Sequence, residues 1–233
     1  MIIASTSTIH GGNYLEYILP ALNSLFEQCN DILFIPYARP GGISHDDYTS
    51  TVRQAFAKID KTVKGLHEFE NPIYAIENAQ GIFTGGGNTF LLVTQLYKNK
   101  VMEVLAKTVQ NGTPYLGSSA GSNITGISMQ TTNDMPIIYP PSFKTLGLIP
   151  FNLNPHYLDA DLQSKHMGET RETRIKEFHA FNDTPVLGLR EGSWLEVTGE
   201  KIILKGELSA RLFRQSQTPE ELATGTDLSF LGK

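Results

Sequence analysis

Short apolar runs alternate along this chain with longer segments in which apolar residues recur at the spacing of an α-helix. This alternation is typical of parallel strands joined by helices that cross over the faces of a sheet. The chain is therefore predicted to be an α/β protein with a mostly parallel sheet and helices on both faces. Strands, each bounded by Gly, Pro, Asn or Asp, are expected at residues 2–5, 32–36, 63–67, 81–84, 115–117, 146–153 and 186–189.

The segments between these runs predict helices. Apolar residues recur at helical spacing within residues 15–26 and 48–59, which indicates helices that bury one face. A third helix is expected to begin near Asn88 and to be followed by a continuation or a second helix up to the stop signal Asn111-Gly112.

The carboxyl-terminal part has a different pattern. Alternating apolar residues with Gly199 at one turn predict a small antiparallel meander of residues 193–197, 201–204 and 211–213. Since neither a linker nor a shift of composition interrupts the chain, residues 1–233 are expected to form a single domain.

The charge pattern argues against nucleic acid as a partner. The formal net charge is −5, and the 19 Lys and Arg residues are scattered without a basic run. Hydrophobic residues make up 40% of the chain and charged residues 18%, which is enough apolar material for a sizeable core. The composition therefore indicates a globular protein.

Cys29 is the only cysteine, so the chain can form neither an internal disulfide nor a cysteine-rich metal site. A buried structural thiol is the expected role of this residue. No apolar run approaches the roughly 20 residues that span a bilayer, and the first residues carry no basic leader. A cytoplasmic protein without membrane contact is expected.

A serine stands in a G-x-S-x-G pentapeptide at residues 117–121, directly after the predicted strand 115–117. In a nucleophile elbow, the serine occupies a tight turn from strand to helix, and small neighbours are required because the backbone is crowded. The sequence thus indicates Ser119 as a nucleophile, with the N–H of Ala120 as a donor to an oxyanion. A simple turn is the alternative, and Ser118 is a competing nucleophile that the glycine spacing disfavours.

A glycine loop at residues 85–87 also follows a predicted strand and precedes a helix. Such a loop exposes backbone N–H groups, so Gly86 or Gly87 is expected to supply a second oxyanion donor beside Ser119. Asn88, the next residue, is expected to belong to the same oxyanion and substrate-binding group. The loop lacks the spacing of a dinucleotide-binding motif and the lysine of a phosphate-binding loop. Phosphate binding and a plain turn remain the alternatives.

A serine hydroxyl needs a base, and the base needs a carboxylate to orient it. His156 is the candidate base because it follows the apolar segment 146–153, at the sheet edge where Ser119 is also expected. Glu191 follows the next strand and is one candidate acid. Asp134, which would give the chain order Ser, Asp, His, is the other. Sequence spacing leaves this choice open, as it does the alternative of His156 as a plain surface residue.

Together these motifs resemble the peptidase E family of serine peptidases, family S51. The resemblance covers almost the whole chain and includes Gly85 to Phe90, Ser119 to Gly121, Thr131 to Pro136, Asn154 to His156, Gly168 to Arg171 and Glu191-Gly192. It implies a flavodoxin-like three-layer sandwich, similar to class I glutamine amidotransferases, with catalytic Ser119 and His156 and with Glu191 or Asp134 as the third member. Ser118 departs from the family, which carries a bulky aromatic residue there.

The resemblance also implies a function, the hydrolysis of dipeptides that begin with aspartate, without a cofactor or metal. The family requires the free amino group and side-chain carboxylate of that residue, so a cation is expected near the pocket. Arg171 is the candidate, because a guanidinium binds a carboxylate through two N–H groups. Pairing of Arg171 with Glu169 or Glu172 is the alternative role, and Arg190 is a weaker candidate.

Other interpretations stay open at this stage. The same scaffold also serves cyanophycinase-like and β-aspartyl peptide hydrolases, and a scaffold with a decayed site can act as a binding protein. The expected binding partner is a small peptide substrate with an N-terminal aspartate. The protein itself is expected to be a monomer or a homodimer. Residues 137–143 are expected to form a lid or a rigid connector.

Overall fold

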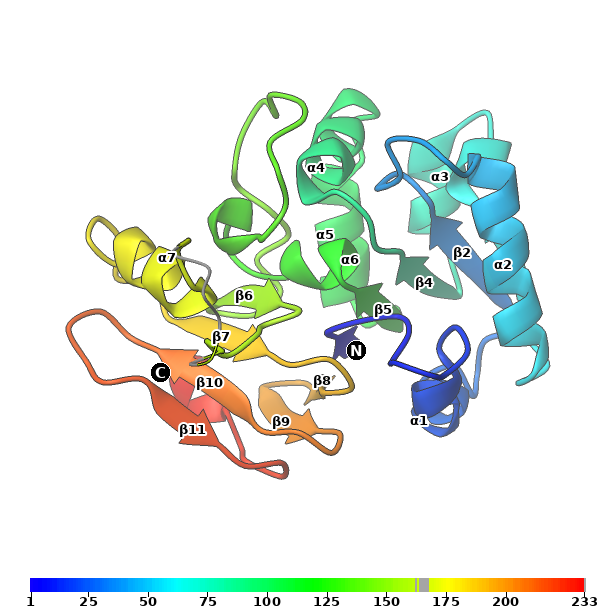
Figure 1. The fold of residues 1–233 in the computed structure, drawn as a ribbon. Coiled ribbons are helices and arrows are strands. Elements are labelled where there is room, and N and C mark those ends of the chain that lie inside the picture. Colours follow the sequence, from blue (N-terminus) through cyan, green and yellow to red (C-terminus); the bar gives the residue numbers. More distant parts are fainter. Residues whose placement is uncertain (162, 164–167, 233) are drawn as a thin grey trace.

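A seven-stranded sheet lies at the centre of the computed structural model, which describes residues 1–161, 163 and 168–232 (Figure 1). The strand order is β3-β2-β4-β5-β1-β8-β9. The first five strands in this order run parallel, whereas β8 is antiparallel to β1 and β9 is antiparallel to β8. The strands are β1 (Ile2–Ala4), β2 (Asp31–Ile35), β3 (Thr62–Gly65), β4 (Gly81–Thr84), β5 (Tyr115–Ser118), β8 (Trp194–Thr198) and β9 (Lys201–Lys205).

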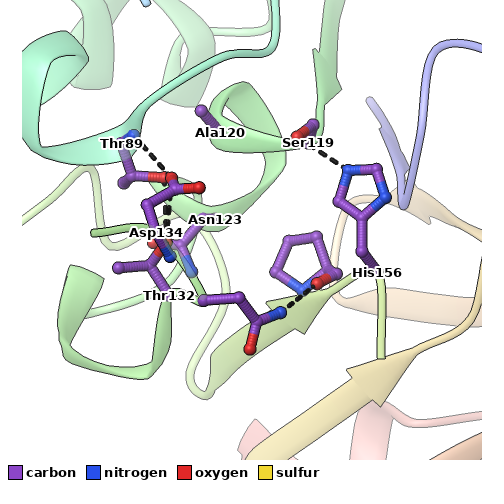
Figure 2. A pocket seen from close by; sticks show the side chains of 9 residues that line it. Thr89, Ser119, Ala120, Asn123, Thr132, Asp134 and His156 are labelled. Atoms are coloured by element: carbon purple, nitrogen blue, oxygen red, sulfur yellow. Dashed lines mark hydrogen bonds between the residues drawn. The ribbon is translucent and has the colours of Figure 1, made fainter. Parts of the chain in front are cut away.

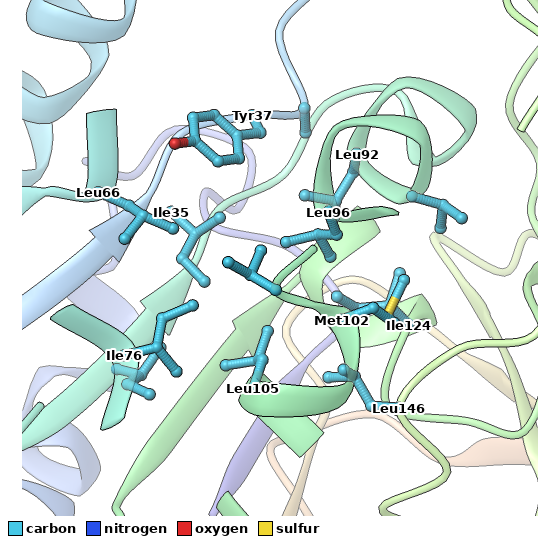
Figure 3. Packing of buried hydrophobic residues seen from close by; sticks show 14 of the residues in the cluster. Ile35, Tyr37, Leu66, Ile76, Leu92, Leu96, Met102, Leu105, Ile124 and Leu146 are labelled. Carbon is cyan, nitrogen blue, oxygen red and sulfur yellow. The ribbon is translucent and has the colours of Figure 1, made fainter. Parts of the chain in front are cut away.

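Helices cover both faces of this sheet, which confirms the predicted three-layer α/β class. Side chains of β2 alternate between the layers: Ile32 and Phe34 pack with α1 and α2, and Leu33 and Ile35 pack with α3, α4 and α5. Figure 3 shows Ile35 in the second of these clusters. The helices are α1 (Leu19–Leu25), α2 (His45–Ala57), α3 (Pro72–Glu77), α4 (Thr89–Lys98), α5 (Met102–Gln110), α6 (Ala120–Asn123) and α7 (Arg171–Phe178), with 3₁₀ turns at Glu16–Ile18, Leu66–Glu68, Met129–Thr131 and Ser229–Gly232. None of the helices within the described ranges is long and apolar enough to cross a membrane.

Polar side chains fix where several helices begin. The side chain of Ser44 accepts a hydrogen bond from the N–H of Asp47 at the start of α2, and Asn88 accepts from the N–H of Leu91 at the start of α4. Each such cap satisfies a donor that the helix cannot pair itself and contributes about 1 kcal/mol. The start of α4 matters for function, because this helix begins beside the glycine loop.

A second, four-stranded sheet has the order β11-β10-β7-β6. Strands β6 and β7 are parallel, and β10 and β11 add antiparallel to them. An apolar cluster that includes Ile3 of β1, Leu153 of β6 and Leu187 of β7 packs this sheet against the first. The strands are β6 (Asn152–Pro155), β7 (Val186–Leu189), β10 (Ala210–Phe213) and β11 (Glu220–Leu222).

The observed strands differ from two predictions, the antiparallel meander and the strand at residues 146–153. The predicted meander is wrong in its third strand, because β10 pairs with β7 and not with β9. The predicted strand 146–153 begins only at Asn152, since the N–H groups of Leu146 and Leu148 bond instead to the carbonyls of Ile124 and Thr125. Leu146, Ile149 and Phe151 are buried by packing and belong to no strand.

Candidate active site

Ser119 occupies a sharp turn between β5 and α6. Its backbone has φ 55° and ψ −112°, a strained conformation that residues other than glycine rarely adopt and that is found mostly at functional sites. The turn needs its glycines: a Cβ on Gly121 would lie 2.1 Å from the carbonyl oxygen of Thr84, and one on Gly117 would lie 2.5 Å from the carbonyl oxygen of Gly121. Ser119 lines a pocket, whereas the competing Ser118 is fully buried.

His156 follows the last residue of β6 and reaches the serine from the second sheet. Its Nε2 lies 2.9 Å from Oγ of Ser119. The backbone N–H of His156 donates to Oγ of Ser5, whose hydroxyl in turn donates to the carbonyl of Leu189. Ser119 and His156 therefore converge from the strand ends of two neighbouring sheets, and the expectation that one sheet carries both is wrong.

Glu191 is the carboxylate that contacts the histidine. Its Oε1 lies 2.7 Å from Nδ1 of His156. A carboxylate only accepts hydrogen bonds, so Nδ1 carries the proton and Nε2 of the neutral ring is free to accept from the hydroxyl of Ser119. The side chains of His156 and Glu191 are 37% and 52% exposed, so water reaches this pair. The three groups form a continuous hydrogen-bonded chain.

Asp134 lies elsewhere in the pocket and has other partners. Its Oδ2 accepts from the backbone N–H of Thr89 at 2.6 Å and from the hydroxyl of Thr132 at 3.1 Å. Both contacts hold the carboxylate at the first turn of α4 (Figure 2). The structure thus brings Glu191, and not Asp134, into contact with His156.

The pocket beside Ser119 is small, with about 210 Å³ of empty volume that includes space open to solvent. Figure 2 shows Thr89 and Asp134 on one side of the pocket and His156 on the other. The lining residues are Thr89, Ser119, Ala120, Asn123, Thr132, Asn133, Asp134, Pro155 and His156.

The glycine loop lies against the serine. A Cβ on Gly86 would lie 2.8 Å from Cβ of Ser119, and one on Gly87, which has φ 144°, would lie 2.2 Å from the carbonyl oxygen of Ala38. Only glycine fits either position without movement of the backbone. Within the described residues, the backbone N–H groups of Gly86, Gly87 and Ala120 have no protein acceptor.

Asn88, the residue after the glycine loop, makes structural contacts around the site. Besides capping α4, its side-chain amide donates to the carbonyl of Met135, and its backbone N–H donates to the carbonyl of Ala38. Asn88 thereby joins the glycine loop to the segment that carries Asp134. The structure places it next to the site and outside the pocket lining.

Arg171 is the first residue of α7, and its guanidinium has no ion-pair partner among the described residues. The expected alternative partners are engaged elsewhere, because Glu169 pairs with Arg174 and Glu172 pairs with Lys176. Burial and the neighbouring charge of Arg174 lower the pKa of Arg171, and the charge of Asp134 opposes them. Arg171 is therefore a free cation within electrostatic reach of the pocket.

Arg190 is committed to protein partners. Its Nε and Nη2 donate to Asp159, and its Nη1 donates to Ser209 and Glu221. Hydrogen bonding to Asp159 raises the pKa of this guanidinium. These contacts leave Arg190 no free face for a substrate carboxylate and join the turn before Glu191 to the segment after His156.

Sequence reasoning missed several residues around the site. Ser5, which holds the backbone of His156, follows β1, and Ala4 of that strand pairs with Ser118. Thr89, Thr132 and Asn133 also line the pocket. They lie within the motifs Gly85 to Phe90 and Thr131 to Pro136, in which the sequence gives them no role of their own. Among the residues that the structure describes, no group of three or more His, Cys, Asp or Glu side chains is arranged to hold a metal ion.

An α/β fold with a hydroxyl, an imidazole and a carboxylate in one hydrogen-bonded chain at its strand ends is the architecture of a serine hydrolase. The model of peptidase family S51 matches residues 1–205. The chain belongs to peptidase family S51.

Individual relatives agree with this assignment. A protein from Streptomyces coelicolor named "Peptidase E" is 50% identical over 99% of this chain and 94% of its own length. A protein from Drosophila melanogaster named "Probable alpha-aspartyl dipeptidase" is 48% identical over 99% of this chain and 96% of its own length. A crystal structure of a peptidase from an acI-B1 Actinobacterium has the same fold, with a TM-score of 0.74 at 17% identity, covering 98% of this chain and 96% of that one.

Proposed function

We propose that the protein is a serine dipeptidase that hydrolyses dipeptides with an α-linked N-terminal aspartate and releases that aspartate. The observation that carries the proposal is the unbroken chain of contacts from Glu191 through His156 to Ser119. The name of the relative from Drosophila melanogaster, "Probable alpha-aspartyl dipeptidase", supports the substrate class.

In the acylation step, Oγ of Ser119 attacks the carbonyl carbon of the aspartyl residue while Nε2 of His156 takes the hydroxyl proton. The carboxylate of Glu191 stabilises the imidazolium that forms. The negative charge moves to the substrate carbonyl oxygen, where the N–H of Ala120 and an N–H of Gly86 or Gly87 stabilise it. His156 then gives its proton to the leaving amine, the C–N bond breaks, and an aspartyl ester of Ser119 remains.

Deacylation repeats the same proton movements with water. His156 takes a proton from a water molecule, whose oxygen attacks the ester carbonyl, and the same donors stabilise the second oxyanion. The proton returns to Oγ of Ser119 as the ester bond breaks and aspartate leaves. Water reaches the half-exposed His156 directly.

Arg171 is proposed to bind the side-chain carboxylate of the substrate. Its guanidinium lies within the electrostatic reach of Asp134 in the pocket wall and has no competing ion pair among the described residues. Two parallel N–H···O bonds to a carboxylate would select aspartate over uncharged residues of similar size.

A substrate panel tests the proposed function. We expect wild-type protein to cleave Asp-Leu much faster than Leu-Leu, Glu-Leu and β-linked Asp-Leu, and Ser119→Ala to lose about 10⁶ in turnover. Near-normal cleavage of Asp-Leu by the Ser119→Ala protein would refute the mechanism. Faster cleavage of the β-linked peptide would instead assign the protein to the β-aspartyl hydrolases.

The role of Arg171 has its own test, with Arg174 as a matched control. Arg171→Met is expected to lower kcat/KM for Asp-Leu about 100-fold, since it removes two hydrogen bonds to a charged group, and to change kcat/KM for Asn-Leu little. Arg174→Met, which removes an exposed arginine paired with Glu169, is expected to leave both nearly unchanged. Equal losses on Asp-Leu and Asn-Leu would exclude Arg171 from recognition of the carboxylate.

We also propose that the enzyme acts in the cytoplasm. The proposal rests on the sequence, in which Cys29 is the only cysteine, because exported proteins often carry pairs of cysteines for structural disulfides. Fractionation of cells with an antibody to the native protein tests this placement, and recovery outside the cytoplasmic fraction would contradict it.

A further inference from the structure

A buried tyrosine hydroxyl contacts the glycine loop and takes no part in the proton transfers. Tyr48 of α2 is 2% exposed, and its hydroxyl donates to the backbone carbonyl of Gly86 at 3.2 Å. We propose that Tyr48 is a positioning residue for catalysis, an inference that rests on the proposed function. Its hydroxyl holds the peptide between Gly86 and Gly87 in the orientation that makes the N–H of Gly87 an oxyanion donor.

The direction of the Gly87 N–H follows from the contact at the Gly86 carbonyl. No cis peptide bond occurs among the described residues, and in a trans peptide the C=O and the following N–H point in opposite directions. Because the carbonyl of Gly86 points to Tyr48, the N–H of Gly87 lies on the side of the peptide away from α2. This N–H has no protein acceptor within the described residues, so it is available to an oxyanion formed at the adjacent Ser119.

The peptide between Gly86 and Gly87 needs an anchor because glycine makes it easy to turn. Rotation of a peptide plane changes ψ of the residue before it and φ of the residue after it, and here both residues are glycine. Gly87 already has φ 144°. The N–H groups of Gly85 and Asn88, on either side, are fixed by backbone carbonyls. The contact with Tyr48 therefore fixes the one part of the loop that its own backbone leaves free to turn.

Tyr48 is itself held firmly enough to act as this anchor. Its ring packs edge-on against Phe34, with centroids 4.9 Å apart, and the guanidinium of Arg39 lies 4.8 Å from its centroid. Since its single proton goes to Gly86, the hydroxyl of Tyr48 accepts from the hydroxyl of Tyr14, at 3.3 Å. A hydroxyl that accepts a hydrogen bond donates a stronger one, so the contact from Tyr14 reinforces the hold on the loop.

Tyr48→Phe tests the inference, because phenylalanine keeps the ring contacts and removes the hydroxyl. With Asp-Leu as substrate, kcat is expected to fall about 5- to 30-fold and KM to stay within about twofold of wild type, since a misdirected donor weakens only the transition state. Loss of an oxyanion donor itself costs about 10²–10³ on general precedent, and the loop keeps part of its orientation without the anchor. Tyr97→Phe is the matched control, because the hydroxyl of Tyr97 also donates to a backbone carbonyl, that of Lys144, and it should change neither constant.

A direct measurement on Gly87 needs no variant. The probe is the boronic acid analogue of aspartate, in which a B(OH)₂ group replaces the α-carboxyl group. Oγ of Ser119 adds to boron and its proton passes to His156, so the tetrahedral boronate carries a negatively charged group with an oxygen at the oxyanion position. In two-dimensional ¹⁵N NMR of the wild-type protein, the amide proton of Gly87 is expected to move downfield on formation of this adduct, and further than that of Gly86.

The results separate the role of Tyr48 from general effects on the protein. Wild-type kcat in the Tyr48→Phe protein, a loss that falls on KM alone, or an equal loss of kcat in the Tyr97→Phe protein would each overturn the inference. If the Tyr48→Phe protein does not fold, the NMR measurement still decides, because a larger downfield shift at Gly86 than at Gly87, or no shift at Gly87, also overturns it. Wild-type protein that forms the adduct and does not cleave Asp-Leu would contradict the proposed function instead.

Discussion

Replacing Glu191 by glutamine separates two contributions of this residue. The carboxylate holds Nδ1 of His156 at 2.7 Å, which fixes the ring and its proton, and its charge stabilises the imidazolium of the transition state. Glutamine keeps an oxygen that accepts from Nδ1 and removes the charge. The Glu191→Gln protein therefore measures the charge alone.

The magnitude follows from the exposure of the pair. A hydrogen bond to a charged group contributes about 1.5–3 kcal/mol, and each 1.36 kcal/mol on a barrier is a factor of ten, which gives roughly a 10- to 100-fold loss. The side chain of Glu191 is 52% exposed and that of His156 is 37% exposed, so solvent screens the charge. We expect the low end, a loss of about 10- to 30-fold in kcat, compared with about 10⁴ for a buried triad acid.

The assay is steady-state hydrolysis of Asp-Leu, with kcat and KM measured separately. KM is expected to stay near the wild-type value, because Glu191 lies outside the pocket lining. Glu196→Gln is a matched control, since Glu196 is also a half-exposed glutamate in an ion pair, with Lys205, and it should change nothing. A loss above 10³ in the Glu191→Gln protein, or none at all, would refute the account of a solvent-screened triad acid.

Two further predictions concern stability. Gly121→Ala places a Cβ 2.1 Å from the backbone oxygen of Thr84 and is expected to lower the free energy of unfolding in urea by at least about 3 kcal/mol. Gly41→Ala is the control, because no atom lies within 4 Å of its Cβ, and it should change the free energy of unfolding by less than about 0.5 kcal/mol. Similar values for the two variants would contradict the claim that the turn at Ser119 is too crowded for a side chain at residue 121. Hydrogen bonding to Arg190 lowers the pKa of Asp159 below its ordinary 3.8, so the stability that Asp159→Asn removes should be present at neutral pH and disappear as the pH falls below that value. A loss that stays constant down to about pH 2 would contradict the ion pair as its source.

The sequence predicted the parts of the fold that depend on local pattern. Strand runs such as residues 81–84 and the turn at Ser119 carry their own signals, because a buried parallel strand is a continuous apolar run and a crowded turn requires glycine. Which strand pairs with which neighbour in the sheet has no such local signal. The apolar pattern of residues 211–213 predicts a strand, and it fits pairing with β7 as well as pairing with β9.

The site could be predicted as a set of residue types and not as a set of contacts. Ser119 and His156 were candidates because each follows an apolar run, yet their meeting depends on how two sheets pack. The choice between Glu191 and Asp134 depended on the same packing. Asp134 is a candidate to orient His156 by its place in the sequence, whereas its partners are the hydroxyl of Thr132 and the N–H of Thr89 at the start of the distant helix α4. Long-range hydrogen bonds of this kind leave no trace in sequence spacing.

The central claim is that Ser119 is a nucleophile activated by His156, and labelling tests it most directly. The protein is treated with a serine-directed aryl phosphonate ester that carries an aspartate-like side chain, and the modified peptide is mapped by mass spectrometry. We expect one phosphonylated residue, Ser119, with labelling abolished in Ser119→Ala and strongly slowed in His156→Ala. Absence of an adduct, or an adduct on Ser118 in its place, would contradict the account.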